Sequence, residues 1–110
     1  MDEELSEFVH LLSEVTCVYL QVEYMDGTYE VESDTFTLTF TRNDEVFEIR
    51  NIDVRSNAGL GSQIIMTIHE YADIMDLEVI ASNVRETAEG FWEKMGYQRG
   101  SSQQKYFRAA

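Results

Sequence analysis

The sequence of 110 residues contains no proline, one cysteine and only eight lysines and arginines. The single Cys17 argues against a disulfide framework, and we expect it to be a small residue of the core. No stretch approaches the roughly 18 apolar residues of a membrane-spanning helix, and the start Met-Asp-Glu-Glu lacks the pattern of a signal peptide. Cys17, His10 and His69 have no partners at metal-ligand spacing, so we expect no metal. Without prolines, repeats or linkers to divide it, the chain is expected to be a single cytoplasmic domain over residues 1–110, with no membrane partner.

Acidic residues dominate the charge, and they are unevenly placed. The formal net charge is −13, and residues 1–41 contain ten Asp and Glu but no Lys or Arg. Residues 42–110 contain eleven acids and all eight bases. Such a field repels nucleic-acid phosphates and attracts cations, so we expect no nucleic-acid partner. Two interpretations of the acidic half stay open, a solubilising surface or a surface that attracts a cationic partner.

Hydrophobic periodicity predicts the order of helices and strands. Apolar residues are spaced as on one helix face over residues 5–15, and they alternate as in a half-buried strand over residues 18–24. Asp26-Gly27 and Asn43-Asp44 predict tight turns. The other expected elements are strands at 28–31, 36–40, 45–54, 77–83 and 105–108, and helices at 62–75 and 86–95. The order α-β-β-β-β-α-β-α-β predicts an α/β (α+β) fold, a mixed, mostly antiparallel sheet flanked by helices.

The most informative motif is Gly59-Leu60-Gly61-Ser62, between the strand predicted at 45–54 and the next helix. Glycines let the backbone turn tightly and approach a ligand. The free N–H groups of a helix's first turn, together with the helix dipole, favour an anion. No lysine follows Gly61, which excludes a P-loop, and Ile64 replaces the third glycine of a dinucleotide-binding loop. The motif therefore predicts a phosphate or pyrophosphate site of another kind.

Two further segments show a family resemblance. The run from Ala88 to Tyr97 resembles the pattern Ala-x-x-Phe-Tyr-x-x-x-Gly-Phe of the GNAT superfamily of N-acetyltransferases, whose coenzyme A loop reads Gln/Arg-x-x-Gly-x-Gly/Ala. The strand from Leu77 to Asn83 is similar to that of bacterial acetyltransferases acting on the N-terminal residue of a ribosomal protein. The resemblance covers roughly residues 46–100. It implies a compact GNAT-like fold, abbreviated at the N-terminus, and acetyl-CoA as the cofactor.

The resemblance also implies a coenzyme site and a general base. Pantetheine amides would pair along the exposed strand edge before the glycine loop, and the pyrophosphate would lie on the loop. The implied base is Glu78, which matches a strand carboxylate of the ribosomal-protein enzymes, with Glu48 and Asp53 as alternatives. The residues implied at the coenzyme site are Ile52, Asp53, Val54, Arg55, Gly59, Leu60, Gly61, Ser62, Asn83 and Trp92.

Two positions depart from the family pattern. Ser56 stands where the loop has Gln or Arg, with Arg55 one position earlier. Trp92 replaces the tyrosine that protonates the leaving thiolate, and an indole N–H does not give up its proton near neutral pH. The position of Trp92 is equally consistent with a residue on the buried face of a helix and with a residue that contacts the coenzyme.

Two functions of different class follow from these observations. The first is acetyl transfer from acetyl-CoA to a cationic primary amine, such as a protein N-terminus, a lysine, a polyamine or an aminoglycoside. The second is a catalytically weakened or inactive coenzyme-binding or interaction module, whose acidic N-terminal half engages a basic protein. The sequence leaves open whether two copies join to complete a shortened sheet.

Overall fold

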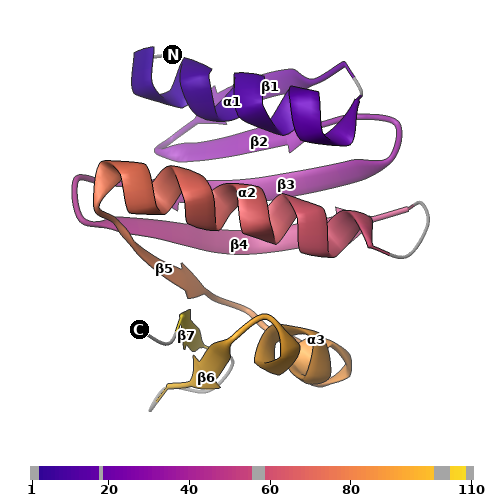
Figure 1. The fold of residues 1–110 in the computed structure, drawn as a ribbon, viewed down its shortest axis with the longest axis vertical. Helices are drawn as coiled ribbons and strands as arrows, with labels where there is room; N and C mark the ends of the chain where they lie inside the picture. The colour runs from indigo at the N-terminus through magenta and orange to yellow at the C-terminus, as the bar shows by residue number, and fades with distance from the viewer. Residues whose placement is uncertain (1–2, 18, 56–58, 101–104, 109–110) are drawn as a thin grey trace.

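The computed structural model describes residues 3–17, 19–55, 59–100 and 105–108 (Figure 1). Its helices are α1 (Glu3–Thr16), α2 (Leu60–Met75) and α3 (Glu89–Lys94), and a 3-10 turn, η1 (Glu86–Ala88), precedes α3. Its strands are β1 (Gln21–Met25), β2 (Thr28–Glu32), β3 (Phe36–Arg42), β4 (Val46–Val54), β5 (Glu78–Ala81), β6 (Tyr97–Arg99) and β7 (Tyr106–Arg108).

The described strands form one sheet in the order β1-β2-β3-β4-β5-β7-β6. All neighbouring strands are antiparallel except β4 and β5, which are parallel and are connected by α2. Asp26 (φ 52°) and Gly27 (φ 84°) make the turn between β1 and β2, and a two-residue hairpin of the common type requires such positive φ values. The predicted mixed, mostly antiparallel sheet with flanking helices is confirmed.

The core lies between the sheet and the two longer helices, α1 and α2, which run side by side over one face of β1–β4 (Figure 1). Phe8 of α1 is fully buried at the centre of this core. Its ring centroid lies 5.5 Å from Phe40, 5.4 Å from Phe47 and 5.0 Å from Tyr71. None of the described helices is long and apolar enough to cross a bilayer.

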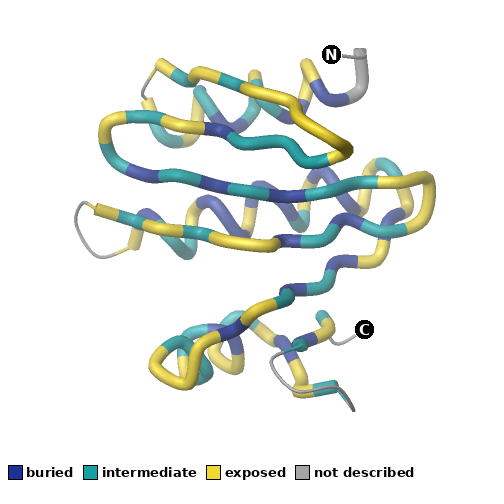
Figure 2. Tube along the Cα trace, turned by 180° about the vertical axis from the view of Figure 1, so that it is seen from behind, coloured by how far each residue is buried: buried dark blue, intermediate teal, exposed yellow. Residues whose placement is uncertain are grey.

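The other face of β1–β4 is not covered by any described helix (Figure 2). Buried and half-buried residues alternate along β3. This alternation shows which residues of the strand face the helices and which face the uncovered side. The strand register then places polar residues of four strands on the uncovered side, which we call the open sheet face. Its polar residues are Gln21, Glu23, Glu30, Glu32, Thr37, Thr39, Thr41, Glu48, Asn51 and Asp53.

Three local predictions differ from the structure. Strand β6 was not predicted, because three residues are too few to show an alternating pattern. The helix predicted at 86–95 begins as the 3-10 turn η1 and is α-helical only in α3. Cys17 is exposed rather than in the core, because it follows the last residue of α1 with a left-handed φ of 57°. Its N–H donates to Ser13 O at 2.9 Å and ends the helix there.

Candidate functional site

The site begins where β4 and β5 separate. The two strands pair in parallel from Val46↔Glu78 to Ile49↔Ala81, and the Ser82 N–H then donates to Ile49 O at 2.9 Å. Beyond this point β4 continues to Val54, paired with β3 alone among the described strands. From residue 50 onward, the backbone edge of β4 that β5 would otherwise cover is therefore not paired with any described strand. We call this branching point the fork.

Two local backbone features open the fork. On β4, the register passes from Phe40↔Ile49 to Thr39↔Asn51, so Arg50 is an extra residue without a partner on β3. A bulge of this kind bends its strand and increases the local twist. On the other arm, Asn83 has a left-handed φ of 56°, which turns the chain away immediately after β5. Both features direct the two arms apart.

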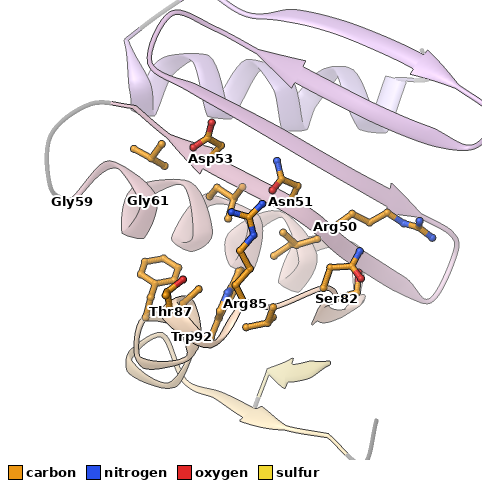
Figure 3. A pocket seen from close by; sticks show the side chains of 16 residues that line it. Arg50, Asn51, Asp53, Gly59, Gly61, Ser82, Arg85, Thr87 and Trp92 are labelled. Carbon is orange, nitrogen blue, oxygen red and sulfur yellow. The ribbon is translucent and has the colours of Figure 1, made fainter. Parts of the chain in front are cut away.

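A cavity of about 660 Å³ lies between the arms, and we call it the fork cleft (Figure 3). This volume lies within the range of roughly 300–1,000 Å³ typical of small-molecule sites. One arm is β4, the other is the segment after β5, and η1 with α3 closes a further side. Its lining residues are Ile49, Arg50, Asn51, Ile52, Asp53, Val54, Gly59, Gly61, Ser82, Asn83, Val84, Arg85, Thr87, Ala88, Phe91 and Trp92.

The N-terminus of α2 forms one end of the fork cleft. Gly59 is its N-cap residue with φ 100°, no side chain of the described residues caps the helix, and no acidic residue lies in its first turn. The first intrahelical bond runs from the Gln63 N–H to Gly59 O at 3.0 Å, so the N–H groups before Gln63 have no carbonyl partner within the helix. Gly61 lies beside Phe91 and Val54, since a Cβ there would be in ordinary contact at 3.5 Å from Phe91 Cε1 and 3.7 Å from Val54 Cγ2. Uncapped N–H groups and the helix dipole make this end suitable for an anion.

The charged residues of the fork cleft are Arg50, Asp53 and Arg85. The Arg85 side chain extends across the cleft toward β4 (Figure 3), and it is exposed and forms no ion pair with any described residue. Arg55, by contrast, is not part of the lining. Its guanidinium donates to Ser33 O at 2.8 Å and lies 3.4 Å from the Asp53 carboxylate, so it is held on the side of β3.

Most residues predicted at the coenzyme site meet in this cleft. Leu60 is buried behind the end of α2, and Ser62 lies in its first turn, but neither lines the cavity. Trp92, only 4% exposed, forms part of the wall, with its ring 4.9 Å from Tyr97. Ser56 lies outside the described residues. The predicted residues that line the cavity are Ile52, Asp53, Val54, Gly59, Gly61, Asn83 and Trp92.

Of the three carboxylates considered as general bases, Asp53 lines the cavity, and Glu78 and Glu48 lie outside it at different distances from the fork. Glu78 is exposed and is the first residue of β5, at the end opposite the fork. Glu48 is paired with Ile80, one position before the last parallel pair. Its side chain is 22% exposed, accepts a hydrogen bond from Thr41 Oγ1 at 3.5 Å and lies 3.6 Å from Arg50 Nε. Of Glu48 and Glu78, Glu48 is therefore nearer to the fork, and neither of these two lines the cavity.

Several residues that line the fork cleft were not predicted from the sequence. Arg50, Asn51, Ser82, Arg85 and Phe91 are the chemically distinctive ones. They could have been found only from their positions, because residues that follow the paired parts of two parallel strands meet at one edge of a sheet. Finding them in this way would have required knowing that β4 and β5 are neighbours.

Comparisons with known proteins show the fold but no close relative. No family model and no curated protein sequence matches the chain. Among solved structures, the anti-CRISPR protein AcrVA5 has a TM-score of 0.64 at 14% identity, covering 76% of this chain and 99% of that one. Naa50 of Arabidopsis thaliana, in complex with the bisubstrate analogue CoA-Ac-MVNAL, has a TM-score of 0.55 at 13% identity, covering 97% of this chain and 91% of its own.

A GNAT-family acetyltransferase from Listeria monocytogenes matches with a TM-score of 0.50 at 15% identity, over 74% of this chain. The fold is that of the GNAT acetyltransferases. The resemblance seen in the sequence is thus confirmed at the level of the fold. The chain spans 62% of the length of the Listeria protein, and at these identities the likeness concerns the fold alone.

Proposed function

We propose that the fork cleft binds acetyl-CoA and that the protein transfers the acetyl group to a cationic primary amine. The observation that carries the proposal is one cleft with an uncapped helix N-terminus at one end and a closed fork at the other. Coenzyme A has matching parts, a pyrophosphate, a chain with two amides and a terminal thiol. The fold shared with the Listeria GNAT acetyltransferase and with Naa50, which was solved with a coenzyme A conjugate, supports the proposal.

The chain's own backbone supplies most of the binding groups. The N–H groups of Leu60, Gly61 and Ser62 would face the pyrophosphate, and Arg85 would add a positive charge from the other arm. The freed edge of β4 from Asn51 to Val54 offers N–H and C=O groups to the two amides, as a sheet edge does to an added strand. These contacts orient the bound molecule along β4, with its acyl end at the fork.

Acetyl-CoA supplies an activated acyl group, and the protein must prepare the amine and stabilise the charge that develops. A protonated amine has to lose a proton before it attacks. We place Glu48 in this role ahead of Glu78 and Asp53. Glu48 is half-buried and one pair from the fork, whereas the Asp53 side chain is 61% exposed and lies 3.4 Å from Arg55. The edge of β4 beyond the fork, which no described strand pairs, would supply a backbone N–H that donates to the carbonyl oxygen as it becomes negative.

The acceptor we propose is cationic because the open sheet face is acidic. Glu48 and Asp53 of this face lie on β4, and Glu23, Glu30 and Glu32 lie farther away, on β1 and β2. The last three belong to residues 1–41, which have no lysine or arginine. A surface of this sign raises the local concentration of cationic groups and speeds their association.

The proposal is tested by titrating the purified protein with acetyl-CoA in a calorimeter and by assaying acetyl transfer to a panel of amines. The panel contains peptides with free N-termini, lysine peptides, polyamines and aminoglycosides, with neutral hydroxylated compounds as controls. Saturable binding and transfer to a cationic member are expected. No binding would overturn the proposal. Binding without transfer to any amine would favour the interaction module, in which Trp92 replaces the family's tyrosine at the expense of catalysis.

A further inference from the structure

Strand β1 forms one edge of the sheet, and no described strand pairs with its outer side. Four of its five residues are exposed, and the strand is uncovered along most of its length (Figure 2). Proteins usually protect such an edge with lysine, proline or a bulge. Strand β1 has no lysine or proline, and its register against β2 is continuous. Its outer side is therefore available to an added strand.

The register shows which backbone groups face this outer side. Met25 and Thr28 flank the two-residue turn and lie opposite each other, as do the two residues that hydrogen-bond across a tight turn. Bonded and non-bonded pairs then alternate along an antiparallel ladder. The N–H and C=O groups of Val22 and Tyr24 therefore point away from β2. An extended segment lying beside β1 would hydrogen-bond to these four groups.

On the side covered by the helices, a row of aromatic rings runs from the core to this edge. Successive ring centroids of Phe47, Phe40, Tyr29 and Tyr24, which lie on four adjacent strands, are 4.6, 5.3 and 4.6 Å apart. Phe47 and Phe40 are buried, whereas Tyr24 is 62% exposed. A side chain of an added strand beside Tyr24 would continue the row, because aromatic and β-branched residues pair well across strands.

On the open sheet face, the same edge is acidic. Glu23 lies directly opposite Glu30, and Glu32 is the next residue of β2 on this face. None of these three carboxylates forms an ion pair with a described residue, and like charges placed directly opposite destabilise a sheet. A second copy of the chain would add to the repulsion, because two β1 strands paired about Glu23 would bring it against its own copy. Charge complementarity therefore favours lysine or arginine in the added strand.

We propose that the outer edge of β1 binds an extended, basic segment of another protein by strand addition. In this segment, lysine or arginine alternates with aromatic or β-branched residues. The basic side chains lie over Glu23 and Glu30, and the others lie beside Val22 and Tyr24. The inference does not rest on acetyl transfer, because β1 is three strands away from β4 and its fork.

The first test is calorimetric titration, without acetyl-CoA, with a short peptide in which lysine alternates with valine and tyrosine. The controls are a peptide with the same residues in scrambled order and one with glutamate in place of lysine. We expect saturable binding of the alternating basic peptide alone, with the Val22 and Tyr24 amides becoming protected from hydrogen exchange. No binding, equal binding of a control peptide, or binding without this protection would overturn the proposal. Sedimentation of the protein alone as a dimer that Tyr24→Pro abolishes would also overturn it, in favour of a second copy.

Variants at Tyr24 separate the backbone contact from the ring. Proline removes the outward N–H and is tolerated in an edge strand at such a position, whereas alanine removes only the ring. Tyr24→Pro should bind the alternating peptide about tenfold or more weaker than Tyr24→Ala, because a carbonyl of the peptide is left unpaired. Equal affinities in the two folded variants would refute strand addition. If Tyr24→Pro does not fold, the exchange protection in the wild type decides.

Variants that reverse one charge test the acidic edge. Glu23→Lys should weaken binding by about 3- to 30-fold, because it replaces attraction with repulsion. Glu7→Lys makes the same charge change at an exposed position of α1 and should alter the affinity by less than about twofold. Equal losses in the two variants would mean that net charge alone attracts the peptide, and would refute its placement along β1.

Discussion

Valine in place of Gly61 should close the anion end of the fork cleft, and alanine should not. A Cβ at this position lies 3.5 Å and 3.6 Å from two Phe91 ring atoms and 3.7 Å from Val54 Cγ2, which is ordinary contact. Gly61→Ala therefore fits, and it should stabilise α2 by up to about 1 kcal/mol. The two methyl groups of valine extend about 1.5 Å further, so Phe91 or Val54 must move into the cleft they both line. Overpacking of this kind typically costs about 1–3 kcal/mol.

The assay is calorimetric titration with acetyl-CoA, together with thermal unfolding of each variant. We expect Gly61→Ala to bind within about threefold of the wild type and Gly61→Val to lose at least about tenfold, equivalent to about 1.4 kcal/mol. Gly90→Val is the matched control, since a Cβ at Gly90 meets no atom within 4 Å. If Gly61→Val remains folded and binds acetyl-CoA as tightly as Gly90→Val does, the assignment of the pyrophosphate to this helix end is refuted.

Three other predictions concern the base, the acceptor and the pH dependence of folding. Glu48→Gln should lower kcat by roughly 10²–10⁴ with little change in acetyl-CoA affinity, while Glu78→Gln should have a small effect; the reverse result would restore Glu78 as the base. The kcat/KM for a cationic acceptor should fall with added salt, because exposed charges are screened over about 8 Å at physiological ionic strength, and a flat profile would leave the acidic half a solubilising surface. Burial, with a smaller contribution from Arg108, lowers the pKa of His69 from its ordinary 6.5 to about 4. The unfolded chain then binds more protons between these values, so stability should fall by on the order of 1–2 kcal/mol, after allowing for solvent screening, as the pH drops from 6.5 to 4. His69→Gln, which can keep the 2.8 Å hydrogen bond to the Tyr97 hydroxyl, should flatten that part of the stability curve, and an unchanged curve would contradict the assignment.

The parts of the site that local sequence determines were predictable. Gly59 and Gly61 stand between a strand and a periodic helix, so the helix N-terminus and its position after β4 could be placed from the sequence. The register of β3 against β4 follows from alternation over long strands, and that register directs Ile52 and Val54 toward the covered face. These elements are long enough for periodicity to show.

What the sequence could not show depends on pairing between distant segments. The fork exists because β5 pairs with only the first half of β4, and because Arg50 forms a bulge that no local pattern marks. The same dependence on distant segments explains why the sequence did not show which arginine lines the cleft. Arg55 precedes the glycine loop in sequence but is bound to Ser33, whereas Arg85 reaches the cleft from a segment 30 residues later. Proximity along the chain therefore pointed to an arginine that does not line the cavity.

The shortness of the β4–β5 pairing has a mechanical consequence. Among the described residues, four residue pairs form the only strand-to-strand link between β1–β4 and the strands that follow α2. A molecule lying in the fork would contact both arms and so hold these two parts of the sheet together. Its binding energy would then add to the cohesion of the two parts, raising apparent stability by about 2.7 kcal/mol at a ligand concentration one hundred times the dissociation constant. The β4–β5 pairing would then separate more easily in the ligand-free protein than in the protein with a bound ligand.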